Sequence, residues 1–392
     1  MYSHLCKAAN AATFLLLALI APTMAPAQTY TVLYTIHGNQ YAAGPLWGVL
    51  QDPEGNLYGT TSGGGETGLG TIFKINANGD ESLIYNFKTI ADGESPASLI
   101  RDTNGNFFGN TYYGGNAFYS FGTVYKLSST GEETVLHTFE GKADGAYPQS
   151  PLAQDAAGNL YGAAFSYGGA NSAGTVFRIT PDGRFSLLHT FAGGTADGCR
   201  PAAGLIFVAD VLYGTTAGCG TYGYGTIFAI SKTGEYVVLY NFGKGDGDSP
   251  LALLMIDAQG NLYGTTGGNY GCGTVFKFSA VGQFTTLHTF SGGLSDGCDP
   301  TSGLVEDARG NLYGTTQFGG KLGFGTVFKV TADGKESVLH NFGGGVKGGL
   351  PPAGLTEDAA GNLYGTTEYG GQLLCGSASD NYGCGVVFKI TP

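Results

Sequence analysis

Charged residues are scarce in this 392-residue chain: they make up 12% of it, and the basic ones are the rarer kind. The 18 Lys and Arg residues stand against 30 Asp and Glu, so the formal net charge is −12 at pH 7 and the pI is about 4.8. Because phosphate backbones are bound by clustered Lys and Arg, nucleic acid is a poor partner for such a chain. Cations, neutral sugars and basic surfaces are electrostatically acceptable partners.

Apolar runs long enough to cross a membrane are missing as well. The most apolar stretch, 11–21, is too short to span a bilayer; it follows Lys7 and precedes small residues at Ala25 and Ala27. This order is typical of a secretory signal peptide. We expect residues 1–27 to be removed and residues 28–392 to form one domain. That domain is expected to be secreted as a monomer, without a membrane span or a C-terminal anchor.

Catalytic signatures are also absent. The sequence contains no nucleophile elbow, no His pair spaced for zinc, no phosphate-binding loop followed by a helix, and no Ser-His-Asp arrangement. Four histidines recur in one strand position that is Tyr in other repeats, which indicates a structural role: His137, His189, His288 and His340. No cofactor is expected, apart from the Ca²⁺ considered below.

Cysteines are few, and six remain once the signal peptide is removed. An even number in an oxidising compartment favours three disulfides. Cys375 and Cys384 share one loop, which makes them a local pair. For the others we expect Cys199–Cys219 and Cys272–Cys298, which would join loops on one face, although these two pairings could be exchanged.

Glycine, by contrast, is abundant at 70 residues, and it frames a phrase that recurs seven times. The clearest copies read Gly-Asn-Leu-Tyr-Gly-Thr-Thr, as at 55–61 and 260–266. Its aromatic residue marks a period of 50 to 53 residues: Tyr58, Phe108, Tyr161, Tyr213, Tyr263, Tyr313 and Tyr364. Each period holds four short β-branched or aromatic runs, here named strands A to D, bounded by Gly, Asp or Pro. A repeated four-stranded unit of this length is typical of a propeller blade.

The two ends of the chain complement each other. The last repeat stops after its C strand, at 387–389, whereas the mature chain begins with a D strand, 31–35, that no blade precedes. We expect the N-terminal strand to complete the last blade. The predicted fold is therefore an all-β, seven-bladed β-propeller with four antiparallel strands per blade. An open solenoid of hairpins is the alternative, and it would not need complementary ends.

The Gly-Asn-Leu-Tyr-Gly-Thr-Thr phrase and a second recurring phrase, Gly-Thr-Val-Phe-Lys, resemble the extracellular bacterial tandem repeats called Gloeo-Verruco (GloVer) repeats. The resemblance extends over the whole mature chain. More loosely, the Asp-x-x-Gly-Asn-Leu-Tyr hairpin is similar to that of NHL-type propellers. The resemblance implies an extracellular, often surface-associated protein with no established activity and no catalytic residues to carry over. Some members have a C-terminal sorting anchor, which is not seen here, so release is expected.

The D–A and B–C loops of such blades share one face, and they are the long and variable loops of this chain, where a rigid scaffold usually carries function. Their aromatic side chains could stack on sugars or peptides, or fold back to fill their own loops. The candidate ligand-binding residues are Trp47, Tyr112, Tyr113, Tyr167, Tyr222, Tyr270 and Tyr369. Trp47 is the only Trp of the chain and stands where sister repeats have Ala or Ser, either as a platform for a ligand or as a plug.

Five D–A loops carry an Asp-Gly ahead of a Pro, and these carboxylates are the candidate metal ligands: Asp92, Asp144, Asp197, Asp246 and Asp296. As a partial acidic ring they could hold Ca²⁺, a cation that takes oxygen ligands. Repeated turn chemistry is the favoured interpretation of the same residues, because Asp-Gly is a common turn dipeptide.

Two functions fit these observations. The first is a non-catalytic binding or structural module whose ligand is a carbohydrate or another extracellular surface component. The second is a secreted polysaccharide lyase or glycoside hydrolase with its site on the same loop face. An enzyme would need unique ionisable residues there, and the nearest candidates are Arg200, Asp248, Asp299 and Lys347.

Overall fold

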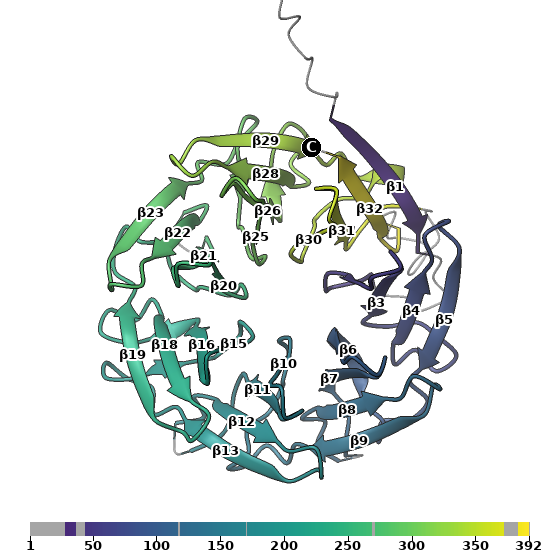
Figure 1. Ribbon diagram of the computed structural model, residues 1–392, viewed down its shortest axis with the longest axis vertical. Coiled ribbons are helices and arrows are strands. Elements are labelled where there is room, and N and C mark those ends of the chain that lie inside the picture. Colours follow the sequence, from purple (N-terminus) through teal and green to yellow (C-terminus); the bar gives the residue numbers. More distant parts are fainter. Residues whose placement is uncertain are drawn as a thin grey trace, which may run out of the picture.

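The computed structural model describes residues 28–36, 44–116, 118–169, 171–268, 271–371 and 383–391. Over these residues, seven four-stranded antiparallel sheets stand like blades around a central axis (Figure 1). In each blade the A strand lies nearest the axis and the D strand forms the outer wall. The predicted seven-bladed β-propeller is confirmed.

The strands follow one another from the axis outward in each repeat. Blades 1 to 3 contain β2 (Leu50–Gln51), β3 (Leu57–Thr61), β4 (Thr71–Ile75), β5 (Glu81–Asn86); β6 (Glu94–Arg101), β7 (Phe107–Tyr113), β8 (Thr123–Leu127), β9 (Glu133–Thr138); and β10 (Ala153–Gln154), β11 (Leu160–Ala164), β12 (Thr175–Ile179), β13 (Phe185–Thr190). Blades 4 and 5 contain β15 (Ile206–Val208), β16 (Val211–Thr216), β18 (Thr226–Ser231), β19 (Tyr236–Asn241); and β20 (Met255–Ile256), β21 (Leu262–Thr266), β22 (Thr274–Phe278), β23 (Phe284–Thr289). Blades 6 and 7 contain β25 (Val305–Glu306), β26 (Leu312–Thr316), β28 (Thr326–Val330), β29 (Glu336–Asn341); and β30 (Thr356–Glu357), β31 (Leu363–Thr367), β32 (Val386–Thr391), β1 (Thr29–Thr35). Two small loop ribbons, β14 (Gly198–Cys199) with β17 (Gly218–Cys219) and β24 (Gly297–Cys298) with β27 (Phe318–Gly319), and the 3-10 turn η1 (Gly345–Lys347) complete the described elements.

The ring is closed by the N-terminal strand. β1 pairs antiparallel with β32, from Thr29 opposite Thr391 to Thr35 opposite Val386, with one irregularity between Val32 and Tyr34. Figure 1 shows β1 lying outside β32 as the fourth strand of the last blade. The expectation that the N-terminal strand completes the last blade is confirmed, and the pairing covers the edge that β32 would otherwise expose.

The two recurring phrases of the sequence are coupled by packing inside each blade. The Phe of the C strand lies over the Gly of the B strand: a Cβ added to Gly264 would come within 2.6 Å of the Phe276 ring. Phe276 is fully buried. A side chain at the Gly would therefore expel the ring, which explains why Tyr-Gly-Thr and Val-Phe-Lys recur together.

The Asp that opens each A–B turn explains a third part of the repeat. In blade 6, Asp307 accepts hydrogen bonds from the backbone N–H and the side-chain amide of Asn311 and from the Tyr313 hydroxyl, at 2.7 to 3.0 Å. Burial acts to raise the pKa of Asp307, but these hydrogen bonds outweigh it and the pKa lies below its ordinary value. The carboxylate thus fixes the turn and the aromatic residue together.

The hydrophobic core lies between blades rather than within them. Among the described residues it falls into seven clusters, each drawn from two neighbouring blades, including one that joins blade 7 to blade 1 through Ile36 and Val387. Each blade is therefore stable only against its neighbours, as expected for repeat architectures.

A ring of hydrogen bonds also links the blades near the axis. The first Thr of the Gly-Thr-Thr phrase donates to a backbone carbonyl of the next blade: Thr315 to Ala353 at 3.0 Å, and Thr366 to Trp47 at 3.0 Å across the closure. Blade 3 departs from the pattern, because Ala163 stands in place of the Thr.

Candidate functional site

Two disulfides fix the loop face. Cys199–Cys219 and Cys272–Cys298 each join a D–A loop to a B–C loop, and both predicted pairings are confirmed. Cys384 is also disulfide-bonded, while its expected partner Cys375 lies outside the described residues. Disulfides of this kind fit an oxidising, extracellular compartment. Within the described part of the chain, no helix combines the length and apolarity that a membrane crossing requires.

A ring of backbone-strained residues surrounds the mouth of this face. The residue before the Pro that leads into strand A has a left-handed backbone in six repeats, with φ between 48° and 61°: Ser95, Tyr147, Arg200, Ser249, Asp299 and Leu350. None of the six is Gly, although a non-Gly residue pays about 1–2 kcal/mol for this conformation. The backbone N–H of each is held by a B–C loop carbonyl, as Tyr147 is by Phe121 at 2.8 Å. The repeat therefore keeps one backbone geometry here and changes the side chain, which is the behaviour expected of a binding surface.

At blades 2 and 3 this ring supports a group of aromatic side chains, called here the aromatic cluster: Tyr112, Tyr113, Phe121, Tyr147 and Tyr167. Tyr147 lies at its centre. Its ring stacks on Tyr112 at 5.1 Å and meets Tyr113, Phe121 and Tyr167 edge-on at 5.9 to 6.2 Å. Tyr113 and Tyr167 remain 42% and 37% exposed, so the cluster is both ordered and open to solvent.

The hydroxyl groups of Tyr112 and Tyr147 stay protonated at neutral pH. Burial, followed by the neighbouring tyrosines, raises the pKa of Tyr112 and of Tyr147 above the ordinary value. The cluster therefore offers flat apolar faces edged by neutral hydrogen-bonding groups.

The predicted aromatic residues divide among different places. Tyr112, Tyr113 and Tyr167 come together, whereas Tyr222 lies exposed beside Tyr240 and Lys244, and Tyr369 pairs with Gly349 near η1. Tyr270 lies outside the described residues.

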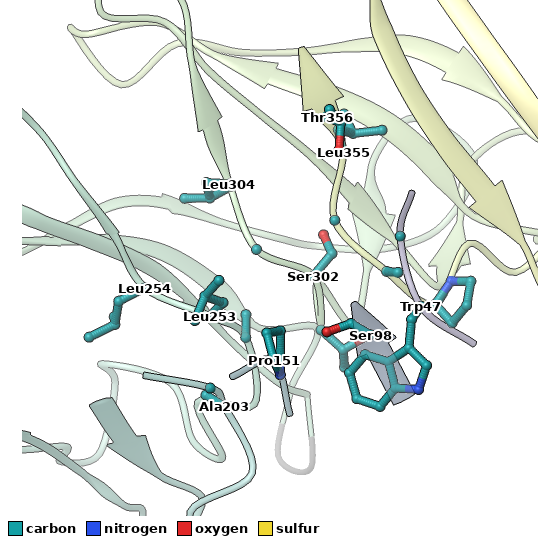
Figure 2. Close-up of a pocket in the computed structure, with 18 of the residues that line it drawn as sticks. Trp47, Ser98, Pro151, Ala203, Leu253, Leu254, Ser302, Leu304, Leu355 and Thr356 are labelled. Atoms are coloured by element: carbon teal, nitrogen blue, oxygen red, sulfur yellow. The ribbon is translucent and has the colours of Figure 1, made fainter. Parts of the chain in front are cut away.

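Trp47 lies elsewhere again, at the axis. It lines a central cavity of about 400 Å³ formed where the seven A strands converge, with apolar neighbours such as Pro151 and Leu253 (Figure 2). The blades approach closely around this cavity: a Cβ added to Gly48 would lie 2.9 Å from the Gly354 carbonyl oxygen. Trp47 is only partly buried and is the largest side chain of the lining, so it narrows the cavity on one side.

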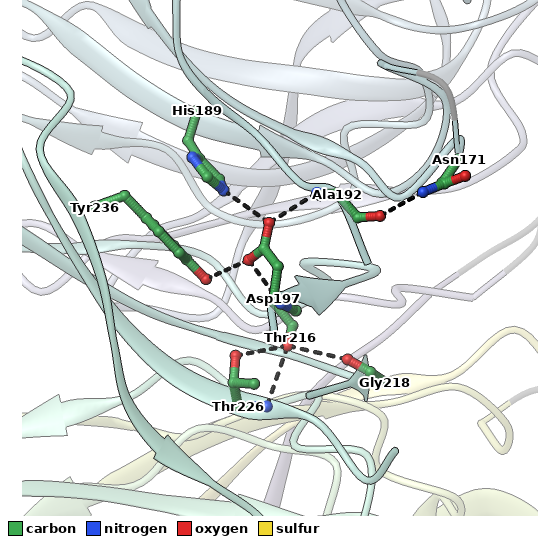
Figure 3. Close-up of polar contacts among 9 residues, drawn as sticks. Asn171, His189, Ala192, Asp197, Thr216, Gly218, Thr226 and Tyr236 are labelled. Atoms are coloured by element: carbon green, nitrogen blue, oxygen red, sulfur yellow. Dashed lines mark hydrogen bonds and ion pairs between the residues drawn. The ribbon is translucent and has the colours of Figure 1, made fainter. Parts of the chain in front are cut away.

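The five D–A loop carboxylates each bond within their own seam between blades. Asp197 accepts hydrogen bonds from the backbone N–H of Ala192 and from the Tyr236 hydroxyl, both at 2.7 Å, and lies 3.2 Å from Nε2 of His189 (Figure 3). Asp92, Asp144, Asp246 and Asp296 bond in the same way to Tyr or His of the D strand or to loop N–H groups. This geometry supports the turn interpretation for most of them.

Two acidic residues from the candidate enzyme set lie in the D–A loops on either side of blade 5, Asp248 before it and Asp299 after it. Asp248 is 6% exposed, and Asp299 accepts a hydrogen bond from the backbone N–H of Gly268 at 3.1 Å. Burial, and then the charge of Asp248, raise the pKa of Asp299. Arg200 and Lys347 lie in other D–A loops.

Sequence reasoning missed Tyr147 and Phe121, the residues that join the cluster. The available signal was positional: Tyr147 precedes a Pro where sister repeats have Ser95, Ser249 or Arg200. A large ring at an otherwise variable position before Pro was a departure from the repeat comparable to Trp47.

These features define a tandem-repeat β-propeller with an ordered, disulfide-fixed loop face. The profile of the Gloeobacter/Verrucomicrobia repeat family matches residues 22–216 and 194–379, and the chain belongs to this family. The resemblance seen in the recurring phrases is confirmed.

Solved structures agree on the fold. The chain resembles the extracellular domain of a candidate one-component system from B. thetaiotaomicron, with 12% identity, a TM-score of 0.57 and 90% of this chain covered; it spans 39% of that chain. It also resembles a candidate 6-phosphogluconolactonase from Bacteroides fragilis, with 17% identity, a TM-score of 0.51, and 79% and 86% of the two chains covered. At these identities the likeness concerns architecture. No curated protein matches the chain.

Proposed function

We propose that this protein is a secreted, non-catalytic binding propeller whose aromatic cluster holds a neutral carbohydrate. The observation that carries the proposal is the position of Tyr147, kept in a strained backbone at φ 59° with its ring at the centre of four others. Five other repeats share this backbone conformation, so the ring that it places among the others is what distinguishes Tyr147.

The chemistry of the cluster supports a sugar ligand. Tyrosine rings combine an apolar face, which can cover the C–H face of a pyranose, with a hydroxyl that bonds sugar hydroxyls, at a low cost in side-chain entropy. The net charge of −12 disfavours anionic polymers, and the exposure of Tyr113 and Tyr167 leaves the cluster accessible from the loop face.

The test is binding of residues 28–392 to a panel of neutral plant and microbial polysaccharides by affinity electrophoresis, followed by calorimetry on the best ligand. Tyr147→Ala keeps a non-Gly residue at the strained position and removes the central ring, so we expect at least a tenfold rise in Kd, about 1.4 kcal/mol. Tyr222→Ala is the matched control, since Tyr222 is exposed on another blade, and it should bind as the unmodified protein does. Equal loss in both variants, or in neither, would contradict the proposal.

The alternative is a glycoside hydrolase on the same face, and the Asp248–Asp299 pair favours it over a lyase. Hydrolases use two carboxyl groups with separated pKa values, and burial together with Asp248 raises that of Asp299. If the protein generates new reducing ends from a polysaccharide that it binds, and Asp299→Asn does not, the protein is a hydrolase rather than a binding module.

A further inference from the structure

The outer seams between blades follow one construction. Each seam joins a His or Tyr of one D strand, in most cases an Asp of the D–A loop, and the first residue of the next D strand. In the seam of Figure 3 these are His189, Asp197 and Tyr236, and the Tyr236 ring stacks on His189 at 3.8 Å. An aromatic ring takes the third position in the same way at Phe185 on His137 and at Phe284 on Tyr240.

In the described part of the chain, three seams have a Glu at the third position instead, Glu81, Glu133 and Glu336, and only the seam between blades 5 and 6 combines it with an imidazole. Its third position, the first residue of β29, is Glu336, which faces His288 of β23 and Asp296 of the D–A loop. One ligand atom from each of the three residues lies within 4.8 Å of the other two, and Nε2 of His288 lies 3.5 Å from Oδ2 of Asp296.

One nitrogen and one oxygen atom of these residues make no hydrogen bond. Nε2 of His288 and Oε1 of Glu336 are both buried and make no hydrogen bond. Oε1 of Glu133 and Nε2 of His340 are unpaired in other seams too, but among the described residues only this seam brings an unpaired imidazole nitrogen and an unpaired carboxylate oxygen together beside an Asp. Because unpaired buried polar atoms are costly, this combination indicates a missing group. Since the partners are a lone pair of imidazole and two carboxylates, that group is a cation.

The separation of His288 from Asp296 and the donor set favour a transition-metal ion over Ca²⁺. Two ligands at about 2.0–2.1 Å from a tetrahedral Zn²⁺ lie about 3.4 Å apart, close to the His288–Asp296 separation. An imidazole with two carboxylates is a donor set that Zn²⁺ accepts, whereas Ca²⁺ takes six to eight oxygen ligands. We propose that His288, Asp296 and Glu336 form a Zn²⁺ site that leaves a fourth position for water.

The loop that carries Asp296 is held in place for this role. Oδ2 of Asp296 accepts hydrogen bonds from the backbone N–H and the hydroxyl of Ser291, at 2.7 and 3.0 Å, which orient it as second-shell partners orient metal ligands. Two residues later, Cys298 is fixed by its disulfide to Cys272. Burial and then Asp296 raise the pKa of Glu336 to about 7, the penalty that a bound cation would relieve.

Other seams supply matched controls. The seam of His189 and Asp197 has the same His, Asp and disulfide-fixed loop, and differs by Tyr236 at the third position. The seam of Tyr85 and Asp92 has a Glu at that position, Glu133, but lacks the imidazole. The proposal therefore predicts that Zn²⁺ binding follows the joint presence of His, Asp and Glu.

The experiment is calorimetric titration of chelator-treated residues 28–392 with Zn²⁺, supported by the visible spectrum of the Co²⁺-substituted protein. We expect one Zn²⁺ per chain, none in Glu336→Tyr, which copies the sister seam and should therefore fold, and an unchanged single ion in Glu133→Gln. Tyr236→Glu should raise the count to two.

Three results would contradict the Zn²⁺ site. A single ion that persists in Glu336→Tyr, a protein that takes up Ca²⁺ but not Zn²⁺, or no binding at micromolar Zn²⁺ would each overturn the assignment. If Tyr236→Glu is unfolded by circular dichroism, the Glu336→Tyr and Glu133→Gln comparison decides alone.

Discussion

The ring of Thr-to-carbonyl hydrogen bonds near the axis should be a measurable part of the stability of the propeller. Thr315 is 1% exposed, and its hydroxyl donates to the Ala353 carbonyl of the next blade at 3.0 Å. Thr315→Val keeps the shape of the side chain but leaves that carbonyl without its donor. Removing one partner of a buried hydrogen bond costs about 1–3 kcal/mol, and we expect about 1–2 kcal/mol here because the methyl group fills the space.

The assay is thermal unfolding of the variant by calorimetry. For a domain of this size, 1–2 kcal/mol corresponds to a fall in Tm of about 1–3 °C, because the unfolding entropy grows with chain length. Thr285→Val, on the exposed side of β23, is the control and should change Tm by less than about 1 °C. The reciprocal change, Ala163→Thr, supplies the donor that blade 3 lacks and should stabilise. A Thr315→Val variant as stable as Thr285→Val would refute the reasoning.

Three further outcomes follow from other parts of the structure. Deleting residues 28–36 leaves blade 7 with three strands and an exposed β32 edge, so we expect aggregation or a fall in Tm above about 5 °C, whereas an unchanged melting curve would mean that closure is dispensable. Replacing both Cys272 and Cys298 by Ser opens a loop with a sequence separation of 26, which should cost about 3 kcal/mol by chain entropy, readable as a shift in the denaturant midpoint. Burial and then Asp92 raise the pKa of Glu133 to about 7, so the folded state loses stability as pH rises from about 4.5 to 7. Glu133→Gln should therefore raise Tm at pH 8 by about 1–2 °C, allowing for solvent screening of this half-buried group, and leave it unchanged at pH 4.

The fold was predictable because the repeat period, the turn residues and the ends of the chain all indicate the same architecture. The period, the Asp-x-x-Gly-Asn turn and the complementary ends all specify blades, and two of the disulfide pairings followed from the face on which their loops lie. Local pattern and global topology agree, which is the condition under which sequence reasoning succeeds.

The candidate site was only partly predictable, for a physical reason. Tyr112 and Tyr113 are the last two residues of β7, but the ring that organises them, Tyr147, comes from the next D–A loop and reaches them through a left-handed backbone. Neither the loop path nor that conformation is encoded by periodicity. The Zn²⁺ site was missed for another reason. His288 was assigned a structural role together with the three equivalent histidines, and Glu336, the residue that sets its surroundings apart, lies in the next repeat.

In a repeat protein, side chains that differ between structurally equivalent positions are a better guide to function than side chains that recur. Most repeat positions are explained by packing: the Gly beneath Phe276, the Asp that holds Asn311, the Thr that ties one blade to the next. A residue that obeys the repeat therefore needs no further explanation. Tyr147 and Glu336 differ from their sister positions in two ways: Tyr147 places a large ring where five other repeats have Ser, Arg, Asp or Leu, and Glu336 places a carboxylate beside an imidazole, where His137 and His189 meet an aromatic ring. The buried, unpaired Oε1 of Glu336 lowers stability on its own, so we expect this residue to persist only where a ligand restores the balance.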